Sequence, residues 1–139
     1  MSIEWDYEKM TTHVPEIDKQ HKEWIRQFNA FDDAVINQKG PDALQSTLSF
    51  LAQYADTHFA LEEAIMKQYH CPAGAANLAA HNEFRMKLAE IMAWVKRGEV
   101  TTVEVLELKM TLGEWLVNHI CTIDVQLRGV VNSVQIRAE

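Results

Sequence analysis

An apolar stripe with helical spacing runs through the middle of the chain, and it contains a histidine and a glutamate. Steps of three and four residues place its members on one face of a helix: Leu44, Leu48, Leu51, Ala55, His58, Glu62 and Ile65. Carboxylates are almost never fully buried unless they are paired or bind a metal. The stripe therefore predicts a polar site inside the fold, which side chains from other segments must complete.

Further segments have the same helical period and are bounded by residues that end helices. We expect helices over about 17–39, 42–69, 75–97 and 101–129. Gly40-Pro41 and the run from Cys71 to Gly74 separate the first three, and a Thr101-x-x-Glu104 capping box opens the last. Gly113 lies inside this last helix, where glycine costs about 1 kcal/mol relative to alanine unless close packing requires it.

Residues 1–16 have no sustained period, but they hold Trp5 and Tyr7, which is typical of an ordered lead segment. Four amphipathic helices joined by short breaks favour an all-α fold, an antiparallel up-down-up-down four-helix bundle preceded by this lead segment. The length of 139 residues and a hydrophobic content of 47% suit one domain, residues 1–139, with a real core.

The charge balance argues against several classes of partner. The chain has 13 Lys+Arg against 20 Asp+Glu, a net charge of −7, so it lacks the basic surface expected for nucleic acid or an anionic membrane. No stretch approaches the roughly 18 apolar residues of a membrane span, and the acidic start does not resemble a signal peptide. We therefore expect a cytoplasmic protein in which Cys71 and Cys121 are reduced thiols.

Polar residues fall on the inward face of every expected helix. They are His21, His58, Glu62, Asn77, His81, His119 and Asp124. If the last helix is continuous, the five-residue step from His119 to Asp124 sets them about 140° apart, on either side of the inward direction. So much buried polarity needs a common partner, and a metal supplies one. Histidines with carboxylates suit a pair of iron ions better than calcium, although zinc and manganese remain open.

The chain resembles the bacterial hemerythrins over nearly its whole length. The resemblance rests on Trp5, the Ile17-Asp18-Lys19-Gln20-His21 run, the His58-x-x-x-Glu62 pair, His81 followed by Phe84, and Trp115-Leu116-Val117-Asn118-His119 with Asp124. It implies two non-heme iron ions and dioxygen as the ligand. By this resemblance His21 and His58 bind one iron, His81 and His119 bind the other, and Glu62 and Asp124 bridge both beside an oxo or hydroxo group.

Position 77 departs from the family pattern, which has a histidine four residues before His81. Asparagine offers only a neutral amide oxygen on a shorter arm, so we expect Asn77 to hydrogen-bond a water that fills the vacant ligand position. His70 is an alternative replacement ligand, because its direction is not fixed by either neighbouring helix. His13, in the lead segment, is expected to face solvent.

Three functions fit this site. The first is reversible dioxygen binding for storage, delivery or sensing. On this interpretation the chain is an oxygen-binding protein rather than a catalyst. The second is turnover of peroxide, nitric oxide or ferrous iron at an iron opened by Asn77, and the third is a mononuclear site that keeps only the first iron. A set of apolar side chains either forms a dry oxygen pocket or simply fills the core: Phe28, Trp115, Leu116 and Ile120. No dedicated protein partner can be named from the sequence.

Overall fold

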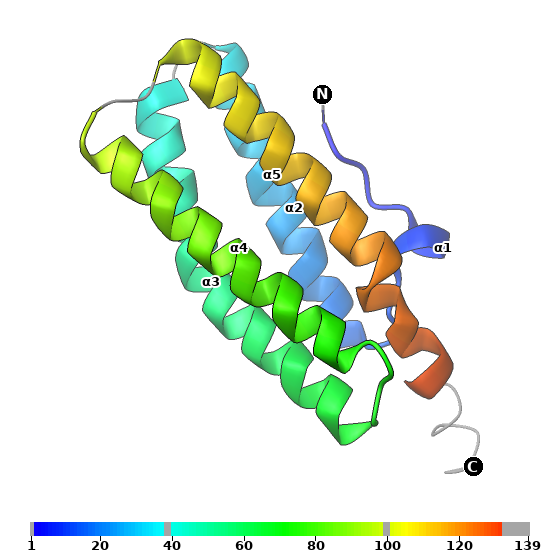
Figure 1. Ribbon diagram of the computed structural model, residues 1–139. Helices are drawn as coiled ribbons and strands as arrows, with labels where there is room; N and C mark the ends of the chain where they lie inside the picture. The colour runs from blue at the N-terminus through cyan, green and yellow to red at the C-terminus, as the bar shows by residue number, and fades with distance from the viewer. Residues whose placement is uncertain (1, 38–39, 99–100, 132–139) are drawn as a thin grey trace.

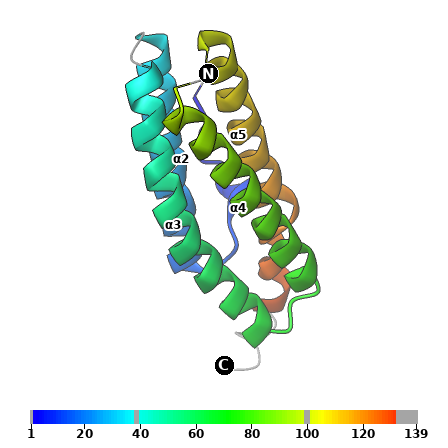
Figure 2. The ribbon, with the colours of Figure 1, turned by 60° about the vertical axis from the view of Figure 1, so that its left-hand side comes forward.

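Four long helices make up most of the computed structural model, and each runs antiparallel to the next one along the chain (Figures 1 and 2). The structure describes residues 2–37, 40–98 and 101–131, without the side chains of 34–36, 40–44 and 102. The long helices are α2 (Pro15–Ile36), α3 (Gly40–Gln68), α4 (Gly74–Lys96) and α5 (Thr102–Thr122). A short helix α1 (Tyr7–Met10) precedes them and a 3-10 turn η1 (Asp124–Gln126) follows. The predicted all-α helical bundle is confirmed.

Two helix starts differ from the prediction because proline is well placed in a first helical turn. Pro15, assigned to the lead segment, begins α2, where its missing N–H costs nothing and its fixed φ suits the helix. Gly40 and Pro41, expected to separate two helices, instead form the first turn of α3. The side chain of Leu44, assigned to the buried stripe, lies outside the described residues.

The end of α5 was predicted wrongly. The helix was expected to continue to Gly129, but it ends at Thr122, and a 3-10 turn follows before residues 127–131 become helical again. The backbone N–H of Gln126 donates to the carbonyl of Ile123, an i to i+3 bond that tightens the chain here. His119 and Asp124 therefore do not share one regular helix, and the angle calculated from 100° per residue does not apply to them.

Residues 2–14 are ordered along the bundle by polar contacts with α2. The backbone N–H of Ile3 donates to the Asn29 side chain at 2.8 Å, and Asn29 donates back to the carbonyl of Ile3. The buried Asp18 carboxylate accepts hydrogen bonds from the hydroxyls of Thr11 and Thr12. These bonds fix the lead segment along α2. One of their partners, Asp18, lies three residues before His21.

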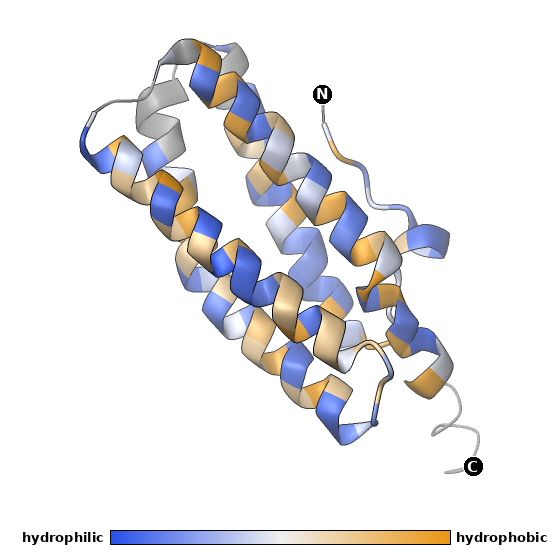
Figure 3. Cartoon of the chain, in the orientation of Figure 1, coloured by the Kyte–Doolittle hydropathy of each residue, from blue (hydrophilic) through white to orange (hydrophobic). Residues whose placement is uncertain are grey.

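The long helices carry apolar and polar residues in turn along their lengths (Figure 3). One apolar cluster fills the bundle around Trp24, Phe31, Phe59 and Phe84, and a smaller one lies near Ile17. Gly113 of α5 packs directly on Phe28 of α2, so the close packing that would justify a glycine is present. Among the described residues, no helix combines the length and apolar character needed to cross a membrane.

Candidate metal centre

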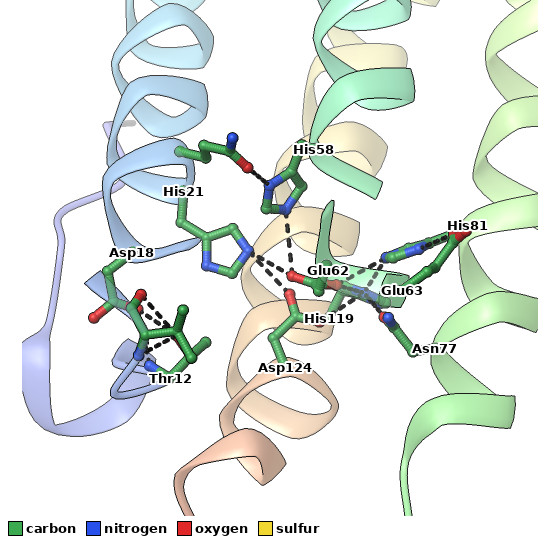
Figure 4. Close-up of polar contacts among 12 residues, drawn as sticks. Thr12, Asp18, His21, His58, Glu62, Glu63, Asn77, His81, His119 and Asp124 are labelled. Carbon is green, nitrogen blue, oxygen red and sulfur yellow. Dashed lines mark hydrogen bonds and ion pairs between the residues drawn. The ribbon is translucent and has the colours of Figure 1, made fainter. Parts of the chain in front are cut away.

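The polar residues predicted to face inward converge on one region of the bundle (Figure 4). Helix α2 supplies His21, α3 supplies His58 and Glu62, α4 supplies Asn77 and His81, α5 supplies His119, and η1 supplies Asp124. All seven are buried, and none is more than 6% exposed. All four long helices and the 3-10 turn therefore contribute a side chain to the same interior cluster.

Glu62 lies between two pairs of histidines, and its two carboxylate oxygens face different pairs. Oε2 is 3.2 Å from Nε2 of His21 and 3.4 Å from Nε2 of His58. Oε1 is 3.1 Å from Nε2 of His81 and 3.9 Å from Nε2 of His119. The carboxylate thus joins two sets of nitrogen ligands.

Asp124 repeats this arrangement from the other end of the cluster. Its Oδ2 is 3.1 Å from Nε2 of His21, and its Oδ1 is 3.1 Å from Nε2 of His119. Two groups able to hold a metal result, one of His21, His58, Glu62 and Asp124 and one of Glu62, His81, His119 and Asp124. In each group the candidate ligand atoms lie within 4.8 Å of one another. The tight turn after α5, and not a continuous helix, aims the Asp124 carboxylate inward.

The spacing of these atoms fits metal ligands better than a network of hydrogen bonds. Two ligands about 2.1 Å from one ion and at right angles lie about 3 Å apart. Nε2 of His21 carries at most one proton, yet it lies within 3.2 Å of oxygens of both Glu62 and Asp124. One proton cannot serve two carboxylates at once, whereas a cation bound among these atoms contacts all of them, so this donor set suits metal.

Without metal, protons balance the buried carboxylates. Burial alone would lower the pKa of His21, but hydrogen bonds to Asp124 and Glu62 outweigh burial and raise that pKa to about 9. The pKa of His119 rises to about 9 for the same reasons, whereas burial lowers the pKa of His58. Burial would raise the pKa of Glu62, yet its histidine contacts hold it well below the ordinary value. A metal must therefore displace protons from this cluster.

Two of the histidines are held from behind through their other ring nitrogen. Nδ1 of His58 lies 2.7 Å from Oε1 of Gln20, and Nδ1 of His81 lies 2.8 Å from Oε2 of Glu63. When Nδ1–H donates to these oxygens, Nε2 keeps its lone pair toward the centre of the cluster. Both contacts thus favour the tautomer that a metal requires.

Aromatic rings fix the planes of the imidazoles. Phe59 stacks on His81 with ring centroids 3.7 Å apart and planes 6° from parallel, and Trp115 stacks on His119 at 4.5 Å and 10°. Trp24 meets the His58 ring edge-on at 5.5 Å. These contacts restrict ring rotation and surround the cluster with apolar surface.

Asn77 lies beside the second group and contacts one of its members. Its Oδ1 is 2.9 Å from Nε2 of His119, its side chain is fully buried, and its Nδ2 has no hydrogen-bond partner among the described residues. His70, kept as an alternative replacement ligand, is exposed after the end of α3, with φ at 52°, and belongs to neither group. His13, expected to face solvent, is half-buried in the lead segment.

The residues expected around an oxygen pocket lie in different places. Phe28 lines a groove between the lead segment and α5, and Trp115 lines another groove between α4 and α5. Leu116 and Ile120 are buried in the main apolar cluster. This distribution agrees with the interpretation that these side chains fill the core.

Sequence reasoning missed the residues behind the histidines, namely Gln20, Glu63 and Phe59. Gln20 directly precedes His21 but contacts His58, and Glu63 directly follows Glu62 but contacts His81 on another helix. A second acid beside a buried one was the available signal for Glu63. No spacing along the chain indicates such contacts, because they join neighbouring helices.

Comparison with known proteins agrees with this geometry. The model of the hemerythrin HHE cation-binding domain family matches residues 12–128. Bacteriohemerythrins of Pseudomonas paraeruginosa and Pseudomonas aeruginosa are each 30% identical over 128 residues, which is 91% of this chain and 78% of each relative.

Solved structures agree as well. A crystal structure of wild-type hemerythrin is 26% identical and superimposes with a TM-score of 0.76, covering 88% of this chain and 92% of that one. A point mutant of hemerythrin reaches a TM-score of 0.80 at 24% identity, with 94% and 98% of the two chains covered. The chain therefore belongs to the hemerythrin family, as a helical bundle with metal-binding groups of histidine, glutamate and aspartate in its core.

Proposed function

We propose that this chain holds two iron ions and binds dioxygen reversibly. The observation that carries the proposal is the pair of ligand groups that share Glu62 and Asp124, each carboxylate offering one oxygen to each group. Imidazole and carboxylate donors suit iron, and the likeness to bacteriohemerythrins supports iron over other metals.

In this proposal the protein residues hold and orient the metals. His21 and His58 would hold the first iron, His81 and His119 would hold the second, and Glu62 and Asp124 would serve both. When bound, the reduced iron pair supplies the two electrons that reversible dioxygen binding requires. The stacked rings of Phe59 and Trp115 cover His81 and His119 with apolar surface, which lowers the dielectric around the site and would limit the entry of water.

Asn77 supports a second candidate function. Its amide oxygen faces the second group, where the family pattern has an imidazole, so the second iron gains only a weak neutral donor or keeps an exchangeable position. An iron with an exchangeable position can act on peroxide, nitric oxide or further ferrous iron. A mononuclear site is less well supported, because both groups are equally buried and have similar spacings.

Aeration cycles test the proposal. The iron-loaded protein is reduced without air, exposed to air, and then returned to an oxygen-free atmosphere while visible absorption is recorded. A carrier gives a band that appears and disappears repeatedly. A band that never appears contradicts dioxygen binding. Irreversible oxidation in the first cycle, together with peroxide consumption in parallel samples, favours the enzyme.

A further inference from the structure

We propose that Glu63 is a positioning residue that makes His81 a stronger electron donor than the other histidines of the centre, so that the two metal positions differ in affinity and reduction potential. This inference rests on the proposed function, since it concerns the same pair of metals. It assigns a role to a carboxylate that lies outside both ligand groups.

The contact between Glu63 and His81 is short and well aligned. Oε2 of Glu63 lies 2.8 Å from Nδ1 of His81, while Nε2 of the same ring lies 3.1 Å from Oε1 of Glu62. The His81 side chain is fully buried, and Phe59 covers one ring face. The ring therefore connects Glu63 directly to the metal-binding atoms and has little freedom to turn away.

The other metal position provides an internal comparison. There Nδ1 of His58 lies 2.7 Å from Oε1 of Gln20, a contact of similar length. A neutral amide accepts the imidazole proton weakly, whereas a carboxylate draws it away and increases the electron density on the ring. The two positions thus have similar hydrogen bonds but partners of different charge.

Arg85 holds Glu63 in place from the surface. Its Nη1 lies 3.4 Å from the same Oε2, and its guanidinium lies 5.0 Å from the centre of the Phe59 ring. Arg85 also faces Asp56, at 3.7 Å, so its positive charge is shared between two carboxylates. The charge of Glu63 is consequently not cancelled, and the side chain is 25% exposed yet fixed toward His81.

This arrangement offsets the weak ligand on the same side of the centre. Asn77 contributes at most a neutral oxygen to the second group, next to His119. Stronger donation from His81 partly restores what a third imidazole would give. Loss of the negative charge at position 63 should therefore weaken metal binding at the second position and favour the reduced, less positive state of the metals.

Exchange of the two acceptors tests the inference. Glu63→Gln keeps an oxygen acceptor and removes the charge, and Gln20→Glu adds a charge behind His58. Ferrous and zinc ions are titrated into each metal-free protein against a competing chelator, and the reduction potential of the iron-loaded form is measured. Glu63→Gln should weaken the affinity of the second binding event by about 10-fold, the lower end of the roughly 10- to 100-fold range for residues that hydrogen-bond metal ligands. It should also raise the reduction potential of the iron-loaded protein. Gln20→Glu should strengthen the first event and lower the potential.

The controls separate this inference from the proposed function. Glu83→Gln removes an exposed charge from α4 and should change neither quantity. A parent protein that binds fewer than two metals contradicts the proposed function, whatever the variants do. If the parent binds two and Glu63→Gln keeps both its affinity and its potential, the inference is overturned. Weaker binding with an unchanged potential also overturns it, because a purely structural role for Glu63 would give that result.

Discussion

At position 77, the side-chain amide oxygen of asparagine lies 2.9 Å from Nε2 of His119. Asn77→His should supply a longer side chain with a stronger nitrogen donor from the same helix face as His81. We expect iron loss to a chelator to slow by about tenfold, equivalent to about 1.4 kcal/mol.

The measurement is the rate of iron release from parent and variant under identical reducing conditions. Asn82→His is the matched control, because Asn82 is an exposed asparagine on the same helix. Equal rates of iron release from the parent and from Asn77→His would show that position 77 does not contribute to metal binding.

Most of the buried polar cluster could be predicted from the sequence because its histidines and Glu62 interrupt apolar stripes. His21, His58 and His81 occupy positions where a helix buries its side chains, and a buried polar residue is informative wherever it occurs. Gln20 and Glu63 could not be found in this way, because they lie at the edge of the buried face and act across to another helix.

Among the elements, α5 shows how close packing can override helix propensity. A Cβ on Gly113 would lie 2.8 Å from Cζ of Phe28, which is buried. Gly113→Ala gains about 1 kcal/mol of helix propensity, but overpacking typically costs about 1–3 kcal/mol. We therefore expect a net loss of stability of up to about 2 kcal/mol, measured by urea unfolding.

Gly129→Ala is the control, since nothing lies within 4 Å of a Cβ there, and it should be neutral or slightly stabilising. Adding Phe28→Leu to Gly113→Ala should recover part of the loss by making room. A Gly113→Ala protein as stable as Gly129→Ala would show that Phe28 moves aside at no cost.

Helix α5 also shows which helix boundaries the sequence can predict and which it cannot. The start of α5 was predicted from its capping box, and both reciprocal hydrogen bonds between Thr101 and Glu104 are present. Its end was not predicted, because no glycine or proline lies between Gly113 and Gly129 to signal the break at Ile123. That break depends on tertiary packing, which places Asp124 in the centre.

For the whole molecule, the metal-free bundle should lose stability as pH rises. The pKa values of His21 and His119 are raised from 6.5 to about 9 by Asp124 and Glu62, despite burial. The folded state therefore binds more protons than the unfolded state between these values. The stabilisation of the folded state by these two protonated histidines is complete below pH 6.5 and is lost as pH approaches 9. The loss is a few kcal/mol, because each unit of pKa shift corresponds to roughly 1.4 kcal/mol.

Urea unfolding of metal-free protein at pH 6.5 and pH 9 measures this change. Asp124→Asn removes a partner of both histidines and should flatten the dependence. Stability that is constant or increases over this range would mean that the carboxylates do not hold protons on these histidines.

Each level of organisation contributes to one centre: helices set the direction of the histidines, a 3-10 turn presents Asp124, and bundle packing excludes water. The bundle architecture followed from the helical period of the sequence alone. The sharing of Glu62 and Asp124 between two groups was implied by the resemblance to bacterial hemerythrins, but the helical period alone could not indicate it, because it requires the relative positions of all the helices.

The amount of iron bound per chain tests this account most directly. Metal-free parent and Glu62→Ala are loaded anaerobically with ferrous iron, freed of unbound metal and analysed for iron and protein. The account predicts two iron ions per parent chain and fewer in Glu62→Ala, since that change removes one ligand from both groups. One iron or none in the parent, or equal iron in the two proteins, would contradict it.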